Sequence, residues 1–98
     1  MALTYSVTDN PARSRFEMAV AGDTAFVLYR REPGVVVLTH AEVPPHLSGK
    51  GLGSTLVRAT LEAIRAEGAL VVVRCSFVRA FMAQHPEFDD LRLPPAAR

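Results

Sequence analysis

The sequence predicts one α+β domain: an antiparallel meander of four strands, a helix, a fifth strand parallel to the fourth, and a C-terminal helix. Three observations support this fold class. Polar and apolar residues alternate with a period of two in segments of residues 3–43, a helical period begins after Pro44-Pro45, and a continuous apolar run occupies residues 69–73. Because a strand, a crossover helix and a returning strand form a right-handed unit in almost all proteins, the fifth strand should lie parallel to the fourth.

Each strand of the meander ends at residues that form turns. In chain order, we expect strands over residues 3–8, 15–20, 24–31 and 35–43. The turns between them contain Asp9-Asn10-Pro11, Ala21-Gly22-Asp23 and Glu32-Pro33-Gly34. The prolines at 44 and 45 cannot continue a ladder of hydrogen bonds, so the meander stops there.

The second half of the chain changes to helical spacing. One apolar face is formed by Leu52, Leu56, Val57, Leu61 and Ile64. Gly68 suits the left-handed residue that ends such a helix, and the run at 69–73 suits a strand buried on both faces. A second helix repeats Phe77, Val78, Phe81 and Met82 and ends near His85-Pro86. We expect residues 91–98 to form a frayed tail.

Length and composition limit the classes of function. A chain of 98 residues is expected to form a single domain over residues 1–98. Eleven basic residues against ten acidic ones provide no strong field for nucleic acid or an anionic membrane. The first ten residues do not match a secretory signal, and no apolar run reaches the length of a membrane-spanning helix, about 20 residues. Together with a single cysteine, Cys75, these features predict a cytoplasmic protein.

A glycine-rich loop, Ser48-Gly49-Lys50-Gly51-Leu52-Gly53-Ser54, lies between the fourth strand and the first helix. Alternate glycines let backbone amides converge on a phosphate-sized anion, and we expect a Cβ there to crowd the approach. Lys50 would add a charge, and Ser54 would cap the helix or donate its hydroxyl. Pro44 stands where a P-loop needs glycine, and Ser54 where a dinucleotide loop does, so neither motif is present. A sharp strand-to-helix turn without a ligand remains open as the alternative.

A family resemblance supports the phosphate interpretation. The segments that carry it are His40-Ala41-Glu42-Val43-Pro44, Gly49-Lys50-Gly51-Leu52-Gly53-Ser54, Cys75-Ser76-Phe77-Val78 and His85-Pro86-Glu87-Phe88. In this order, across nearly the whole chain, they resemble the minimal, cysteine-containing branch of the GNAT acetyltransferases. Gly51 and Gly53 fit that superfamily's pyrophosphate motif, whereas Ser48 departs from its first position, which is Gln or Arg.

The resemblance implies a GNAT-like fold that binds acetyl-coenzyme A as cosubstrate. In that fold the fourth and fifth strands splay apart, and the pantetheine arm enters the gap. Backbone groups of Ala41, Glu42 and Val43 would bind this arm, and Phe81 could line its channel, although a core position is the open alternative. The pyrophosphate would bind at Gly49, Lys50, Gly51, Leu52, Gly53 and Ser54.

Acetyl transfer to an amine requires a group that removes the amine's proton, because a lysine-like ammonium has a pKa near 10.4. His40 and Glu42 are two residues apart and so share one face of the fourth strand. The resemblance makes Glu42 the preferred base, because many GNAT enzymes use a carboxylate of the fourth strand; a solvated carboxylate is the alternative. His40 could be catalytic or structural. The resemblance implies that Cys75, at the start of the second helix, lies near the thioester, where it could carry the acyl group, donate a proton to the departing thiolate, or be an inert wall residue.

Three classes of function follow from these residues. The leading hypothesis is an N-acetyltransferase that acts on a primary amine of a small molecule or a protein. A coenzyme-A-binding module without efficient catalysis is the runner-up. Many larger enzymes of the GNAT family that the chain resembles place a proton-donating tyrosine on the helix after the fifth strand, whereas Phe77 and Phe81 lack a hydroxyl. A protein-interaction domain is the third. The histidines show no metal-ligand spacing, so we expect no metal; the acceptor and the oligomeric state stay open.

Overall fold

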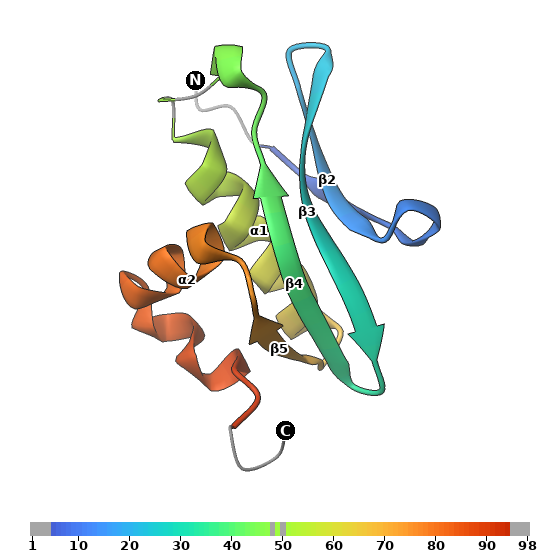
Figure 1. The fold of residues 1–98 in the computed structure, drawn as a ribbon, viewed down its shortest axis with the longest axis vertical. Helices are drawn as coiled ribbons and strands as arrows, with labels where there is room; N and C mark the ends of the chain where they lie inside the picture. Colours follow the sequence, from blue (N-terminus) through green and yellow to red (C-terminus); the bar gives the residue numbers. More distant parts are fainter. Residues whose placement is uncertain (1–4, 48, 50, 95–98) are drawn as a thin grey trace.

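Five strands form one sheet, in the order β1-β2-β3-β4-β5, in a computed structural model that describes residues 5–47, 49 and 51–94 (Figure 1). The strands are β1 (Val7–Asn10), β2 (Arg15–Val20), β3 (Asp23–Glu32), β4 (Val35–Glu42) and β5 (Leu70–Val73). The helices are α1 (Leu52–Ala66) and α2 (Ser76–Ala83), with short 3₁₀ turns at Pro11–Arg13, Pro45–Leu47 and Pro86–Leu91. Strands β1 to β4 pair antiparallel and β5 pairs parallel to β4, which confirms the predicted fold class.

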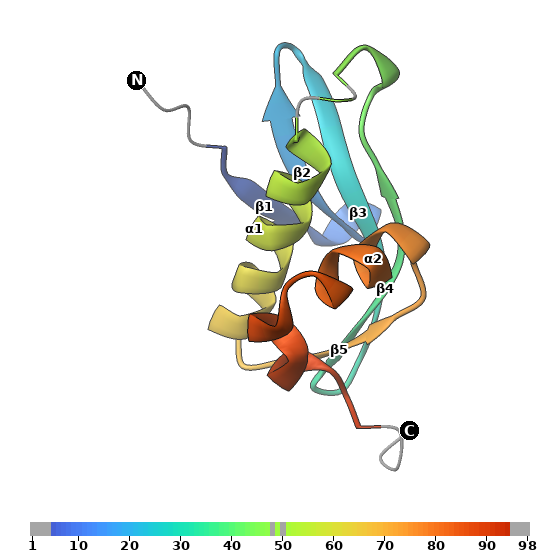
Figure 2. The same cartoon turned by 90° about the vertical axis from the view of Figure 1, so that its left-hand side faces the viewer.

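Both helices lie on the same face of the sheet (Figure 2). Inward side chains of the strands, such as Phe16 and Val27, belong to one buried cluster with Leu61 of α1 and Met82 of α2. The apolar face predicted for α1 is buried there in full. In the part of the chain that the structure describes, no helix lies over the opposite face, which we call the open face.

A β-bulge in β4 decides which of its side chains reach the open face. Leu28 of β3 pairs with His40, but the next residue, Tyr29, pairs with Leu38, so Thr39 is an extra residue in β4. Leu38 is buried in the core, and strict alternation would have pointed His40 inward as well. Ala41 packs against the core instead. The bulge therefore turns His40 and Glu42 toward the open face.

The C-terminal end of α1 forms the predicted glycine cap. Gly68 has a φ of 77° and donates its N–H to the carbonyl of Arg65 at 3.0 Å, while Ala69 donates to Ile64 at 3.3 Å. This pair of bonds is the Schellman arrangement, in which a left-handed residue satisfies the last carbonyls of a helix. The chain then reverses directly into β5.

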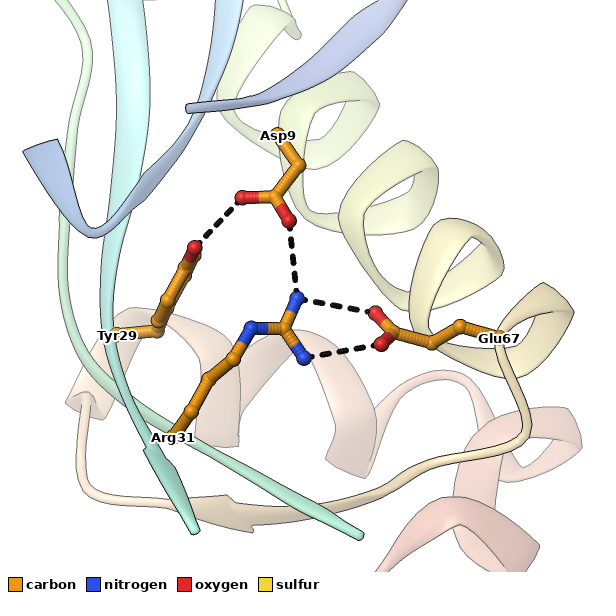
Figure 3. A network of polar contacts seen from close by, with 4 residues as sticks. All are labelled: Asp9, Tyr29, Arg31 and Glu67. Atoms are coloured by element: carbon orange, nitrogen blue, oxygen red, sulfur yellow. Dashed lines mark hydrogen bonds and ion pairs between the residues drawn. The ribbon is translucent and has the colours of Figure 1, made fainter. Parts of the chain in front are cut away.

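The first strand differs from its prediction. It covers Val7–Asn10 rather than residues 3–8, and residues 3 and 4 lie outside the described part of the chain. Asp9 does not form the predicted turn, because its carboxylate accepts hydrogen bonds from Tyr29 at 2.7 Å and Arg31 at 3.0 Å (Figure 3). These two partners lie on β3, so they hold Asp9 in the sheet, and the turn begins one residue after Asn10, at Pro11.

The predicted frayed tail is wrong for the residues that the structure describes. The 3₁₀ turn Pro86–Leu91 buries Phe88 and Leu91, which are 3% and 4% exposed. Leu93 then donates its N–H to the carbonyl of Val71 at 2.8 Å, on the outer edge of β5. Residues 95–98 of that prediction lie outside the described residues.

None of the described helices is long and apolar enough to span a membrane.

Candidate functional site

Strands β4 and β5 separate halfway along β4. Their register ends where Leu38 pairs with Val73, and the last bond runs from the N–H of Arg74 to the carbonyl of Leu38 at 2.9 Å. Beyond this bond, β4 continues to Glu42 with β3 as its partner, whereas the segment that follows β5 turns away from β4 into α2 (Figure 1). Among the described residues, no strand pairs with the β5-side edge of β4 from Thr39 to Glu42.

The glycine loop leads directly into α1. Gly49 and Gly51 have φ values of 80° and 73°, in the left-handed region that favours glycine. Gly51 is the N-cap residue, and among the described residues no side chain caps the start of α1. The first amides of α1 have no intrahelical acceptor by geometry, and they lie at the positive end of the helix dipole. The loop thus offers backbone donors to an anion.

One expectation about the loop needs correction, and a second stays a prediction. Ser54 does not cap α1; it lies within the first turn, and the side chain that bonds back to Gly51 is that of Thr55, whose Oγ1 donates to the carbonyl at 3.1 Å. A Cβ at Gly49 or Gly51 would meet no protein atom within 4 Å, so crowding against the protein does not explain these glycines, and crowding of an approaching anion stays a prediction. Their positive φ is the structural reason for glycine. Ser48 and Lys50, both predicted in this loop, lie outside the described residues.

Crowding does apply at Gly53. A Cβ built there would lie 2.5 Å from Cζ of Phe77, in the first turn of α2. Phe77 is 45% exposed and lines a hollow of about 310 Å³ together with Val43, Leu47, Ser54 and the glycines of the loop. Sequence reasoning placed Phe77 in the apolar stripe of α2. Its departure from the buried positions Val78, Phe81 and Met82 became visible only in the packed structure.

A second hollow, of about 370 Å³, lies between α1 and α2 and shares Ser54 with the first. Phe81 lines this second hollow, where its ring stacks on His85 with centroids 3.9 Å apart and planes 13° apart. The Arg58 guanidinium lies 5.6 Å from the Phe81 ring centroid and 3.4 Å from the Glu87 carboxylate. Sequence reasoning missed Arg58, although its place four residues after Ser54 puts both on one helix face.

His40 and Glu42 lie together on the open face, as their spacing predicted. Nε2 of His40 is 3.4 Å from Oε1 of Glu42, and the side chains are 54% and 58% exposed. Val43, the next residue, is half-buried and lines the hollow of the glycine loop. The end of β4 therefore presents the carboxylate of Glu42 on one side of the sheet and Val43 on the other.

Cys75 lies at the junction of β5 and α2, where the sequence placed it. Its side chain is 7% exposed and packs in the core cluster, and the residue is the extended N-cap of α2. Within the described residues, no group of three or more His, Cys, Asp or Glu side chains is positioned to hold a metal ion.

Comparison with known proteins identifies the family. Residues 15–91 match the family model of GCN5-related N-acetyltransferases. The fold is similar to the NMR structure of a GCN5-like protein from Staphylococcus aureus that is assigned as an N-acetyltransferase, with a TM-score of 0.67 and 21% sequence identity over 90% of this chain and 87% of that one. Among proteins of curated function, none matches the sequence significantly. The family match covers most of the sheet and both helices, and the chain belongs to the GCN5-related N-acetyltransferases.

Proposed function

We propose that this protein transfers an acetyl group from acetyl-coenzyme A to a primary amine. The observation that carries the proposal is the β5-side edge of β4 from Thr39 to Glu42, with which no described strand pairs. Val43, the next residue, lines one hollow with Gly51 at the start of α1. A backbone edge offers donors and acceptors to the amide groups of a pantetheine arm, and a helix start offers amides to a pyrophosphate. Belonging to the acetyltransferase family supports the same assignment.

The proposed contacts extend along the whole length of the cosubstrate. Ala41, Glu42 and Val43 would bind the pantetheine arm with their backbone groups. The amides around Gly51 and Gly53 would bind the pyrophosphate, with Lys50 and Ser54 as further candidates, and Phe77 would pack beside it in the hollow of the glycine loop. Arg58, in the adjoining hollow, is a cation suited to the 3′-phosphate of the nucleotide.

Glu42 would serve as the base, with His40 beside it at 3.4 Å as an alternative or a relay. When bound, acetyl-coenzyme A supplies an activated acetyl thioester. The ammonium of the acceptor gives one proton to Glu42, its nitrogen forms a bond to the acetyl carbon, and the carbon–sulfur bond breaks. The second amine proton leaves with the departing thiolate or to water, so the products are an amide, coenzyme A and one released proton.

Cys75 would act near the thioester, either as an acyl carrier or as the proton donor to the thiolate, because its position at the start of α2 follows the separation of β4 and β5. A thiol in this role suits a reducing compartment such as the cytoplasm. Acetyl-cysteine detected by mass spectrometry after mixing with acetyl-coenzyme A alone would support the carrier role, and full activity of Cys75→Ala would support direct transfer.

Calorimetry with acetyl-coenzyme A, followed by turnover on a defined amine, tests the proposal. We expect binding below millimolar Kd in both wild type and Glu42→Gln, and loss of turnover by about 100-fold or more in Glu42→Gln. Glu32→Gln is the matched control, since Glu32 is an exposed carboxylate on the same sheet. Failure to bind the cofactor would refute the proposal. Binding without any turnover would favour the alternative, a coenzyme-A-binding module without efficient catalysis.

A further inference from the structure

We propose that the acceptor amine is a lysine side chain of another protein, which reaches Glu42 across the open face of the sheet. This inference rests on the proposed function, and it names the acceptor class that the function leaves open. It follows from the exposure of the proposed base, from the apolar side chains beside it and from the charges on the open face.

The proposed base stands on an open surface. Glu42 and His40 are each more than half exposed, and five hollows of about 310 to 460 Å³ on the described surface are lined by other residues. A small ligand normally binds in a concave site that buries most of its surface. A small amine at Glu42 would lack such walls, so its binding energy must come from a larger molecule that carries it.

Half-buried apolar side chains lie beside the base on the open face. Cross-strand pairing places Phe26 of β3 opposite Glu42, and Leu28 opposite His40. Directly opposite residues in a sheet point to the same face, with Cβ atoms about 5 Å apart. The Arg15 guanidinium lies over the Phe26 ring, 4.4 Å from its centroid, so Leu28 is the member of this pair that side chains flanking an acceptor lysine can reach. Extended polypeptides place alternate side chains on one face, so a lysine at Glu42 puts the residue two positions away near Leu28.

The charges on the open face favour a cation at Glu42. Along β2, Arg15 forms an ion pair with Glu17, and along β3, Arg30 lies 3.1 Å from Glu32. These carboxylates each face an arginine, which keeps its charge at any physiological pH. Glu42 instead faces a histidine. Of these three carboxylates, Glu42 is the one that has no permanent cation beside it among the described residues, and it attracts the ammonium of an incoming lysine.

The test compares two acceptors with one purified enzyme and saturating acetyl-coenzyme A. One is a blocked nonapeptide with a central lysine and a leucine two residues away; the other is a single lysine blocked at both ends. We expect kcat/KM to be at least about tenfold higher for the peptide, which corresponds to burial of one apolar side chain. A blocked lysine or spermidine that reacts as well as the peptide would overturn the inference.

Variants on the open face locate the contact. Leu28→Asn should raise KM for the peptide and leave both the rate on blocked lysine and the Kd of acetyl-coenzyme A unchanged. Val35→Asn is the matched control, because Val35 is also a half-buried apolar residue, is paired with Glu32, and should change neither acceptor. Leu28→Thr keeps strand preference if Leu28→Asn melts early. Equal effects of Leu28→Asn on both acceptors would refute the docking surface, whereas absent cofactor binding would refute the underlying function.

Discussion

At the scale of single residues, replacing Gly53 should affect the stability of the protein and its affinity for the cofactor in opposite directions. It lies in the first turn of α1, where alanine is favoured over glycine by up to about 1 kcal/mol. The added methyl meets the tip of the Phe77 ring, which can rotate away. We expect Gly53→Ala to keep or raise the free energy of unfolding by up to about 1 kcal/mol and to weaken acetyl-coenzyme A binding at least about fivefold, because the methyl and the displaced ring enter the hollow of the loop.

Gly68→Ala provides the control for Gly53→Ala, with urea unfolding and calorimetry as the two measurements. Gly68 has a φ of 77° and lies at the far end of the same helix, so alanine there should cost about 1 kcal/mol of stability and leave the cofactor affinity unchanged. Unaltered cofactor affinity in Gly53→Ala would remove Phe77 and this hollow from the binding site.

Arg58 should decide whether the protein distinguishes coenzyme A from its form without the 3′-phosphate. We expect the wild type to bind coenzyme A about five- to tenfold more tightly than dephospho-coenzyme A at low salt, and Arg58→Gln to bind both equally. Competition calorimetry at two salt concentrations measures this ratio. Arg65→Gln is the control, because Arg65 is an equally exposed arginine of α1 whose guanidinium is engaged by Asp90 at 2.7 Å. Discrimination that survives in Arg58→Gln would assign the 3′-phosphate elsewhere.

At the scale of elements, a polar network ties β1, β3 and the end of α1 together (Figure 3). Arg31 bonds both Asp9 and Glu67, and the Tyr29 hydroxyl donates to Asp9. Burial, and then the bond to Asp9, raise the pKa of Tyr29 above its ordinary value. A raised pKa contributes stability that is fully present below about pH 10 and is lost as the pH rises through the folded-state pKa.

Tyr29→Phe should therefore cost about 1 to 2 kcal/mol at neutral pH and lose less stability than the wild type on further alkalinisation. Unfolding in urea at pH 7 and at pH values above 10 measures both effects. The chain has two tyrosines, so in Tyr5→Phe the tyrosinate absorbance reports Tyr29 alone. A midpoint of that absorbance change at or below pH 10 would show that the network does not raise the pKa of Tyr29.

The elements differ in how far the sequence predicts them. Strong periodicity identified β2, β3, α1 and α2 to within a few residues, and a continuous apolar run identified β5. The sequence did not predict the bulge at Thr39. A bulge shifts the alternation of polar and apolar residues, but the preceding run Val35–Leu38 is apolar at every position and has no alternation to shift. The turn Pro86–Leu91 was missed as well. Phe88 and Leu91 stand three residues apart, which suits a 3₁₀ helix, but six residues are too few for a periodic signal.

The candidate site was predictable where its parts are local in sequence. Gly49, Gly51 and Gly53 define the loop by spacing alone, and His40 and Glu42 share a face for the same reason. Contacts between α1 and α2 depend on tertiary packing, so the positions of Phe77 over Gly53 and of Arg58 beside Phe81 carried no sequence signal of their own. A pattern can place residues on an element, but the approach of two elements decides which of them meet.

At the scale of the whole molecule, the last described segment closes the core rather than trailing from it. Phe88 and Leu91 belong to the same buried cluster as α1, α2 and the sheet, and Arg65 of α1 bonds Asp90 between them. Truncating one buried leucine to alanine costs about 2 to 5 kcal/mol. Small domains have a total stability of about 5 to 15 kcal/mol, so this segment holds a large share of it.

Leu91→Ala should therefore lower the free energy of unfolding by about 2 to 4 kcal/mol, and a chain ending at His85, which lacks both buried side chains, should show no cooperative transition. Asp89→Ala is the control in the same turn: its side chain is exposed, and we expect a change within about 0.5 kcal/mol. Urea unfolding followed by circular dichroism gives all three values. If Leu91→Ala were as stable as Asp89→Ala, residues 86–93 would be an appendage, and the cooperative unit would end with α2.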